Sequence, residues 1–285
     1  MGQNVSKSQN WTDYLMDAFN MGRQTYGQAT VDRYTLAPMQ NNWNYSYYGD
    51  VFLGSDLQYL QVIWDTGSGN FLVRSSFCTN CSNDRSSEPW FDVETTTSIV
   101  VTSDEDSTTY ISGDTLEGFL VYDDVCPLAD RDSCAEGFRF VAIHTQAGID
   151  GQLAGVLGMW SGNSPSLDQE EMFMNKMVET SLIDKNIFSF YLTGVDGDSY
   201  IDFGEPNPAA MSDPADLVYM DVIDDTPFWT EYVTGIRFET GVDSNGDLTY
   251  ESYSIPASKS ETDSGSSCII GPTKYINTIR DKIVA

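Results

Sequence analysis

A short motif of Asp, Thr or Ser, Gly and Ser occurs twice in the sequence, and each copy stands beside an apolar segment. The first copy, Asp65-Thr66-Gly67-Ser68, lies between the apolar runs 60–64 and 71–73. The second copy, Asp263-Ser264-Gly265-Ser266, is followed by the apolar residues 268–270. A carboxylate at the tip of a buried strand must be hydrogen-bonded or shared, because an unpaired buried charge costs several kcal/mol. The two loops therefore predict two carboxylates that face each other.

Together with further landmarks in the same order, these motifs resemble the pepsin-like aspartic proteases. The other landmarks are an opening strand at 47–54, a flap hairpin containing Tyr110-Ile111-Ser112-Gly113, apolar-Gly and apolar strands at 153–159 and 187–192, and two second-lobe motifs, Phe228-Trp229 and Gly271-Pro272-Thr273. The resemblance covers most of residues 45–285. It implies an all-β, bilobal pepsin-like aspartic protease fold.

The resemblance also predicts how the chain is divided. A domain takes about 100 to 200 residues, so the 285 residues allow two lobes. We expect an N-terminal extension or propeptide-like segment at 1–40. An N-terminal β lobe with the first Asp loop and the flap should span 41–205, and the first part of a C-terminal β lobe with the second Asp loop should span 206–285.

The second lobe is expected to be incomplete in this chain. The first lobe has the apolar-apolar-Gly strand Val156-Leu157-Gly158, and no counterpart follows Asp263. A lobe cut at this point would leave apolar residues and strand edges uncovered, which folded proteins avoid. The remainder is predicted to come from a second chain, either a product of the same precursor or a different subunit.

Acidic side chains outnumber basic ones by 43 to 14, which gives a formal charge of −29. This charge argues against nucleic acid or an anionic membrane surface as a partner. It fits either a well-solvated surface or an adaptation to acidic pH. No apolar run approaches the roughly 18 residues of a membrane span, so no transmembrane segment is expected. The pair Asp123-Asp124 is expected to lie in an exposed turn.

The cysteine spacing predicts two local disulfides, Cys78–Cys81 and Cys126–Cys134. The first pair could be half of a zinc site, but the chain has one histidine and lacks further convergent ligands. We therefore expect no metal and no cofactor. The family resemblance places a small disulfide loop where the first pair lies. Cys268, within an apolar run, is expected to be a buried thiol.

Four sequons are candidates for N-glycosylation, at Asn4, Asn10, Asn44 and Asn80. Glycans and disulfides both form in an oxidising compartment. With the family resemblance, they favour a secreted protein in an extracellular or an acidic lysosome- or vacuole-like compartment. Residues 1–6 also fit an N-myristoylation signal if Met1 is the initiator.

The resemblance assigns a role to each residue of the two loops. Asp65 and Asp263 would be the catalytic pair, one taking a proton from water and the other giving a proton to the carbonyl oxygen. Two carboxylates about 3 Å apart cannot both ionise, so the pair would share one proton over a broad acidic range. The supporting residues would bring the loops close, cross-link them and hydrogen-bond the outer carboxylate oxygens: Thr66, Gly67, Ser68, Ser264, Gly265 and Ser266. Tyr110 and Gly113 of the flap would cover the cleft.

Three departures from the family pattern bear on activity. Leu72 stands where the family usually has a Trp that hydrogen-bonds the flap tyrosine, Ala154 replaces a commonly acidic residue, and residues 258–262 are polar where an apolar strand is expected. Both Asp loops favour an aspartic endopeptidase that cleaves polypeptides at acidic pH, with an activity that can require a second chain. Leu72 and the polar residues 258–262 favour the alternative, a catalytically inactive protease-like module with a structural or binding role in an extracellular assembly. Ala154 is expected to alter substrate preference.

Overall fold

The computed structural model describes residues 35–42, 46–81, 90–111, 113–147, 154–162, 172–194, 197–211, 213, 215, 217–223 and 226–284. The chain divides into two compact units, Met1–Asp32 and Arg33–Ala285. All described residues belong to the second unit. Most of the predicted N-terminal segment lies outside the described residues, as do the sequons at Asn4, Asn10 and Asn44.

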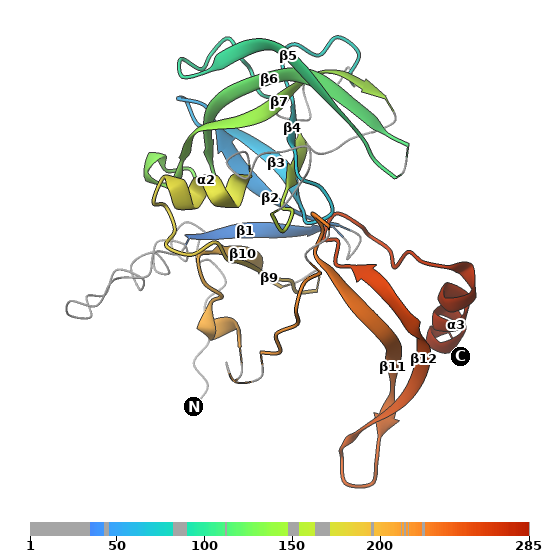
Figure 1. The fold of residues 1–285 in the computed structure, drawn as a ribbon. Helices are drawn as coiled ribbons and strands as arrows, with labels where there is room; N and C mark the ends of the chain where they lie inside the picture. The colour runs from blue at the N-terminus through green and yellow to red at the C-terminus, as the bar shows by residue number, and fades with distance from the viewer. Residues whose placement is uncertain are drawn as a thin grey trace, which may run out of the picture. The chain divides into compact units, whose positions relative to one another are not determined.

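Within the described part of the chain, ten strands form one mostly antiparallel sheet (Figure 1). In chain order they are β1 (Thr35–Asn42), β2 (Ser46–Leu53), β3 (Gln58–Asp65), β4 (Phe71–Arg74), β5 (Val100–Thr109), β6 (Thr115–Cys126), β7 (Ala135–Ala147), β8 (Gly155–Gly158), β9 (Phe188–Tyr191) and β10 (Ser199–Phe203). Their order in the sheet is β5-β6-β7-β4-β8-β3-β2-β1-β10-β9, and β6 pairs with β2 as well. This extra pairing folds the sheet back on itself and encloses a core.

Strand β3 shows how the sequence builds this core. Side chains alternate between the two faces of a strand, and Leu60, Val62 and Trp64 of β3 are fully buried. The Trp64 ring packs 5.8 Å from the ring of Phe173 and 5.3 Å from that of Phe203. Phe173 begins helix α2 (Phe173–Glu179), which therefore covers this part of the core.

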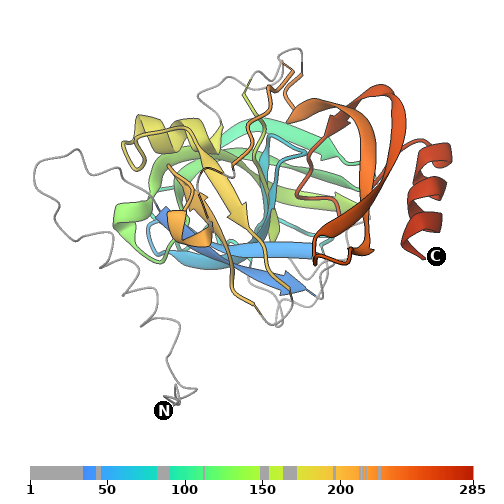
Figure 2. The ribbon, with the colours of Figure 1, turned by 90° about the horizontal axis from the view of Figure 1, so that it is seen from below.

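A second, two-stranded sheet follows in the chain. It is the hairpin of β11 (Thr230–Val242) and β12 (Leu248–Glu261), whose turn holds Gly246 at φ 89°, a conformation that favours glycine. The hairpin is mostly exposed. Helix α3 (Thr273–Ile283) lies beside it in both views, and Lys282 pairs with Glu251 of β12 (Figure 2). Two short 3-10 helices, η1 (Arg131–Ser133) and η3 (Pro208–Ala210), complete the described elements.

The structure confirms the all-β class and both predicted disulfides. Cys78 and Cys81 are bonded with their Cα atoms 5.7 Å apart, and Cys126 and Cys134 with theirs 4.0 Å apart. Cys268 is a free and exposed thiol, so the prediction of a buried thiol was wrong. Residues 268–270 form no strand, and none of the described elements covers them.

The acidic pair Asp123-Asp124 is also placed differently from the prediction. Both residues lie in β6 and are buried. Asp123 accepts hydrogen bonds from the hydroxyls of Thr96 and Ser98, and Asp124 pairs with Arg131. These partners compensate the cost of burial, which the local sequence alone does not reveal.

Candidate active site

Asp65 ends strand β3 and is held by the loop that follows it. Ser68 donates its hydroxyl to Asp65 Oδ2 at 2.5 Å, and the Gly67 N–H donates to Oδ1 at 2.9 Å. The Asp65 carbonyl accepts from Met159 N at 2.7 Å, just beyond strand β8, which runs parallel to β3. Asp65 is only 6% exposed. The first Asp loop is therefore fixed by its own serine and by the strand beside it.

The second Asp loop is hydrogen-bonded directly to the first. Thr66 Oγ1 donates to Thr262 O at 2.8 Å and accepts from Ser264 N at 2.8 Å. Ser264 Oγ in turn accepts from Thr66 N at 3.0 Å and donates to Trp64 O at 2.6 Å. The structure thus brings together two segments that are far apart in the sequence, through the hydroxyl of one residue in each loop.

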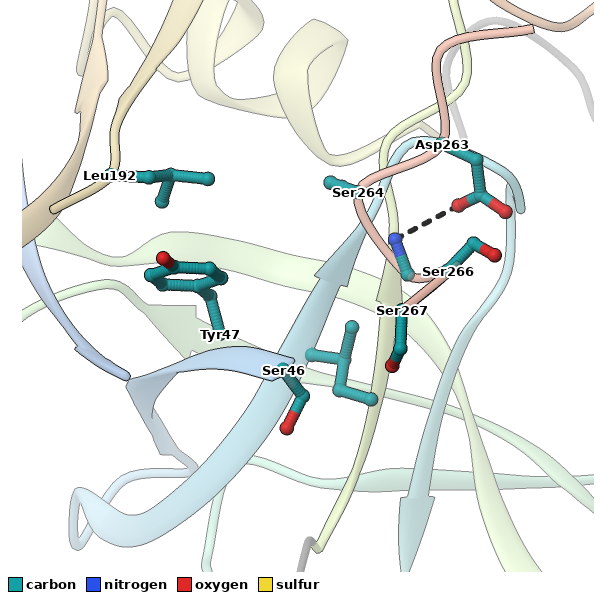
Figure 3. A pocket seen from close by; sticks show the side chains of 9 residues that line it. Ser46, Tyr47, Leu192, Asp263, Ser264, Ser266 and Ser267 are labelled. Carbon is teal, nitrogen blue, oxygen red and sulfur yellow. Dashed lines mark hydrogen bonds between the residues drawn. The ribbon is translucent and has the colours of Figure 1, made fainter. Parts of the chain in front are cut away.

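Two glycines let each carboxylate approach the opposite loop. A Cβ atom at Gly67 would lie 2.6 Å from Asp263 Oδ1, and one at Gly265 would clash with the Asp65 carboxylate. The Gly265 N–H donates to Asp263 Oδ1 at 2.8 Å (Figure 3). No larger side chain fits at either position without moving a carboxylate. The glycines are therefore needed for the close approach of Asp65 and Asp263.

The surroundings of Asp65 favour its protonated form. Burial raises the pKa of Asp65 to about 6, and the hydrogen bond from Ser68 opposes this rise. A hydrogen bond shared with the Asp263 carboxyl and the negative charge of Asp263 also contribute to this raised pKa. Two carboxyls this close titrate together, so a proton on them cannot be assigned to one residue.

Glu261 is a third carboxylate near this pair. Burial raises the pKa of Glu261 to about 7, and the charges of Asp263, Asp65 and Glu231 contribute to the rise. The sequence indicated polar residues ahead of the second loop, but it did not distinguish Glu261 among them. In the folded chain, the charges of both Asp residues act on Glu261 and favour its protonated form.

Tyr110 occupies the end of the β5–β6 hairpin, which the resemblance identifies as the flap. Burial raises the pKa of Tyr110, and so does the negative charge of Asp65. Its hydroxyl is buried and has no hydrogen-bond partner among the described residues, while Leu72 is fully buried in the cluster against which Tyr110 packs. Gly113 forms the turn at φ 91°, with its N–H donating to Tyr110 O at 2.9 Å. Ser112 lies outside the described residues.

The outer side of the second loop differs from the expectation. Ser266 donates its hydroxyl to Cys268 O at 3.2 Å, within its own turn, and not to Asp263. The prediction that Ser266 hydrogen-bonds the Asp263 carboxylate was wrong, because its hydroxyl donates within the turn 266–268 instead. A pocket of about 200 Å³ opens here (Figure 3), lined by Ser46, Tyr47, Ile63, Leu192 and residues 263–267.

Other expected sites were also located in the structure. Asn80, the one sequon within the described residues, is exposed, and its amide donates to Gln146 O at 3.2 Å. A glycosylated asparagine keeps one N–H, so a glycan there is compatible with this bond. Among the described residues, no three acidic, histidine or cysteine side chains converge as a metal site requires. None of the described helices is long and apolar enough to cross a membrane.

Comparison with known proteins gives the family directly. The sequence profile of the eukaryotic aspartyl proteases matches residues 46–285. Pepsin A of Bos taurus is 27% identical over 278 residues, which cover 94% of this chain and 68% of that protein. Cathepsin D of Gallus gallus is 25% identical over 91% of this chain and 62% of its own length.

A fungal relative shares a shorter region. Vacuolar protease A of Neurospora crassa is 30% identical over 178 residues, 60% of this chain and 42% of that protein. The chain therefore spans about two thirds or less of the length of these relatives. Because the family profile matches most of the chain, and the two Asp loops meet in the structure, the protein belongs to the pepsin-like eukaryotic aspartyl protease family.

Proposed function

We propose that this protein is an aspartic endopeptidase that hydrolyses peptide bonds in polypeptides at acidic pH. The observation that carries the proposal is the mutual approach of the two Asp loops, in which Thr66 and Ser264 exchange hydrogen bonds and each glycine makes room for the opposite carboxylate. The raised pKa of Asp65 supports a pair that holds one proton. Such a pair supplies a general base and a general acid at the same time.

The reaction uses the ionised carboxylate and the protonated carboxyl of the pair, which approach each other closely and share one proton. The ionised carboxylate takes a proton from water, and the water oxygen bonds to the peptide carbonyl carbon. The protonated carboxyl gives its proton to the carbonyl oxygen, which yields a tetrahedral diol. The C–N bond then breaks, and the leaving nitrogen receives the proton that came from water. One diol hydroxyl gives its proton to the carboxylate that had protonated the carbonyl oxygen, which yields a carboxylic acid and an amine and restores the pair with one proton. Tyr110 of the flap covers this site and limits access of bulk water.

Cleavage of a denatured protein tests the proposal. The protein, purified together with any companion chain, is assayed between pH about 2 and about 7 beside Asp65→Asn and Asp263→Asn, each of which should lower kcat by about 10²- to 10⁴-fold. Asp132→Asn, on an exposed residue of η1, is the matched control and should cleave like the wild type. Absence of cleavage by the wild type, or full activity of either dyad variant, would overturn the assignment.

We further propose that additional polypeptide, most simply a second chain, covers the exposed apolar surface around the second loop. Ile269 and Ile270 are more than 70% exposed, and Asp263 is exposed beside the pocket of Figure 3. In this proposal the second loop is held fully in place only in the assembly. Native mass measurement tests it: a companion chain is expected, and a well-folded monomer of 31.7 kDa would contradict it.

The exposure of Asp263 also favours the second candidate function, an inactive protease-like module that binds other proteins in an extracellular assembly. A monomer that is well folded and inactive at every pH would select this function. For either function we propose an oxidising secretory, lysosome-like or vacuole-like location, which the two disulfides support. Mapping of glycopeptides at Asn4, Asn10, Asn44 and Asn80 tests this location.

A further inference from the structure

We propose that Trp229 is a positioning residue that links the two Asp loops through hydrogen bonds to the segments that support them. Its indole N–H binds the segment that supports the first loop, and its backbone carbonyl binds the residue that precedes the second Asp. The proposal concerns the same site as the proposed function, and its catalytic consequence rests on that function.

The link to the first loop runs through Met159. Trp229 Nε1 donates to Met159 O at 2.7 Å, and Met159 N donates to Asp65 O at 2.7 Å. One residue therefore separates the indole from the backbone of Asp65. Strand β8 ends at Gly158, so Met159 lies just beyond the strand, and the indole supplies the hydrogen bond to its carbonyl.

The link to the second loop runs through Thr262. Thr262 N donates to Trp229 O at 3.0 Å, and Thr262 O accepts the hydroxyl of Thr66 at 2.8 Å. Asp263 is the next residue in the chain. Trp229 thus contacts the supporting segment of each loop, whereas Thr66 and Ser264 join the loops at their tips.

The surroundings of Trp229 hold it in place. Its ring meets that of Phe188 edge to face, with centroids 5.4 Å apart. The neighbouring Pro227 carbonyl accepts from both the backbone N–H and the hydroxyl of Ser161, each at 2.9 Å. The segment 227–229 is therefore attached to the segment 158–161 at two points, so that Trp229 can transmit the position of one loop to the other.

Removing the indole N–H should loosen the spacing of the two carboxylates. Water can then reach Asp65 more easily, and the influence of Asp263 on it weakens. Both effects lower the pKa of Asp65, which burial and Asp263 raise. As the pH rises, activity that depends on the shared proton should then be lost at a lower pH than in the wild type.

The experiment compares three variants of the full chain with the wild type. Trp229→Phe removes the N–H and keeps an aromatic ring. Replacement of Trp229 by β-(3-benzothienyl)alanine, in which sulfur takes the place of the N–H, keeps the size of the side chain and guards against misfolding. Tyr232→Phe is the control: it also changes one aromatic side chain, but Tyr232 of β11 is exposed.

Both Trp229 variants should lower kcat about three- to tenfold, with KM within about twofold, and move the alkaline limb of the pH profile about half a unit toward acid. Tyr232→Phe should leave that limb in place. An NMR titration of the Asp65 carboxyl, assigned through Asp65→Asn, should show the same shift. If both Trp229 variants keep the alkaline limb and the Asp65 titration of the wild type, the proposal is overturned. If the wild type cleaves nothing, the proposed function fails, and the NMR titration still decides the role of Trp229.

Discussion

At the scale of single residues, opposing effects set the proton affinity of Asp65. Burial and the neighbouring Asp263 raise its pKa to about 6, while the hydroxyl of Ser68 lowers it. The 2.5 Å hydrogen bond from Ser68 favours the charged form of the carboxylate, because it satisfies an oxygen that has little access to water. Ser68 therefore limits how far the pKa of Asp65 rises.

Ser68→Ala should raise the pKa of Asp65 above about 6, since the variant loses a hydrogen bond that stabilises the ionised form. The alkaline limb of kcat/KM should move to higher pH, the opposite direction from the Trp229 variants. The pH profile of peptide cleavage measures this shift. Ser258→Ala, on the exposed β12, is the control and should retain the wild-type profile. A limb that moves toward acid in Ser68→Ala would contradict this view of Asp65.

Tyr110→Phe should affect stability and activity in opposite directions. The Tyr110 hydroxyl is buried without a partner among the described residues, and such a group costs about 1 to 3 kcal/mol. Its removal should therefore raise the free energy of unfolding by about 1 kcal/mol. If the hydroxyl binds substrate, kcat/KM should fall about tenfold. Urea denaturation and peptide kinetics measure the two effects, with Tyr122→Phe as the control; a destabilised Tyr110→Phe would contradict the first.

At the scale of secondary-structure elements, the corner between β6, η1 and β7 depends on one ion pair. Arg131 donates to Asp124 Oδ2 at 2.6 Å and to Gly54 O at 3.1 Å, and Gly137 N donates to Asp124 Oδ1 at 3.1 Å. The Cys126–Cys134 disulfide closes the same corner. The buried Asp124 carboxylate is thus satisfied by two elements that meet β6 there, η1 and β7.

Arg131→Met should destabilise the protein by about 2 kcal/mol, because it leaves the buried Asp124 with fewer partners. This loss of stability is smaller than that expected for a fully buried ion pair, because the Arg131 side chain is 44% exposed. Arg280→Met, which breaks an exposed pair with Asp281, should change stability by about 0.5 kcal/mol or less. Urea denaturation measures the free energy of unfolding of both variants. Equal losses would show that the ion pair at this corner adds no more stability than an exposed pair.

Sequence patterns predicted the elements whose partners are local or repeated. Strand β3, the loop after it and the two disulfides follow from alternation, motif and spacing. Sequence patterns did not predict three other features, because each depends on which distant segment covers the residue. These features are the burial of Asp123-Asp124, the exposure of Cys268 and the hydrogen bond of Ser266. Trp229 was visible as a landmark, but its two hydrogen bonds join segments that only the folded chain brings together.

At the scale of the whole molecule, buried carboxyls and net charge both favour acidic pH. Burial raises the pKa of Asp202 to about 6, as it does for Asp65, against an ordinary value of 3.8. The folded state therefore binds these protons more readily than the unfolded state does, and this contribution to stability is lost as the pH rises from about 4 through about 6. Self-repulsion from the −29 charge acts in the same direction.

The melting temperature should accordingly be higher at pH about 5 than at pH about 7. Asp202→Asn, which cannot ionise, should flatten part of this dependence, whereas the exposed Asp132→Asn should follow the wild-type curve. Calorimetry across this range measures both. A melting temperature that rises toward neutral pH would mean that other groups, with pKa values lowered on folding, outweigh Asp65 and Asp202.

In the proposed function Asp65 and Asp263 act as one catalytic unit, and a double-mutant cycle on peptide cleavage tests this claim. Single Asp65→Asn and Asp263→Asn variants and the double variant are compared with the wild type at the pH of highest activity. If the two carboxyls share one proton and one reaction, each single change should remove nearly all activity, and the double variant should be within about tenfold of either. Losses that multiply in the double variant, or an Asp263→Asn variant that still cleaves at the wild-type rate, would contradict the claim.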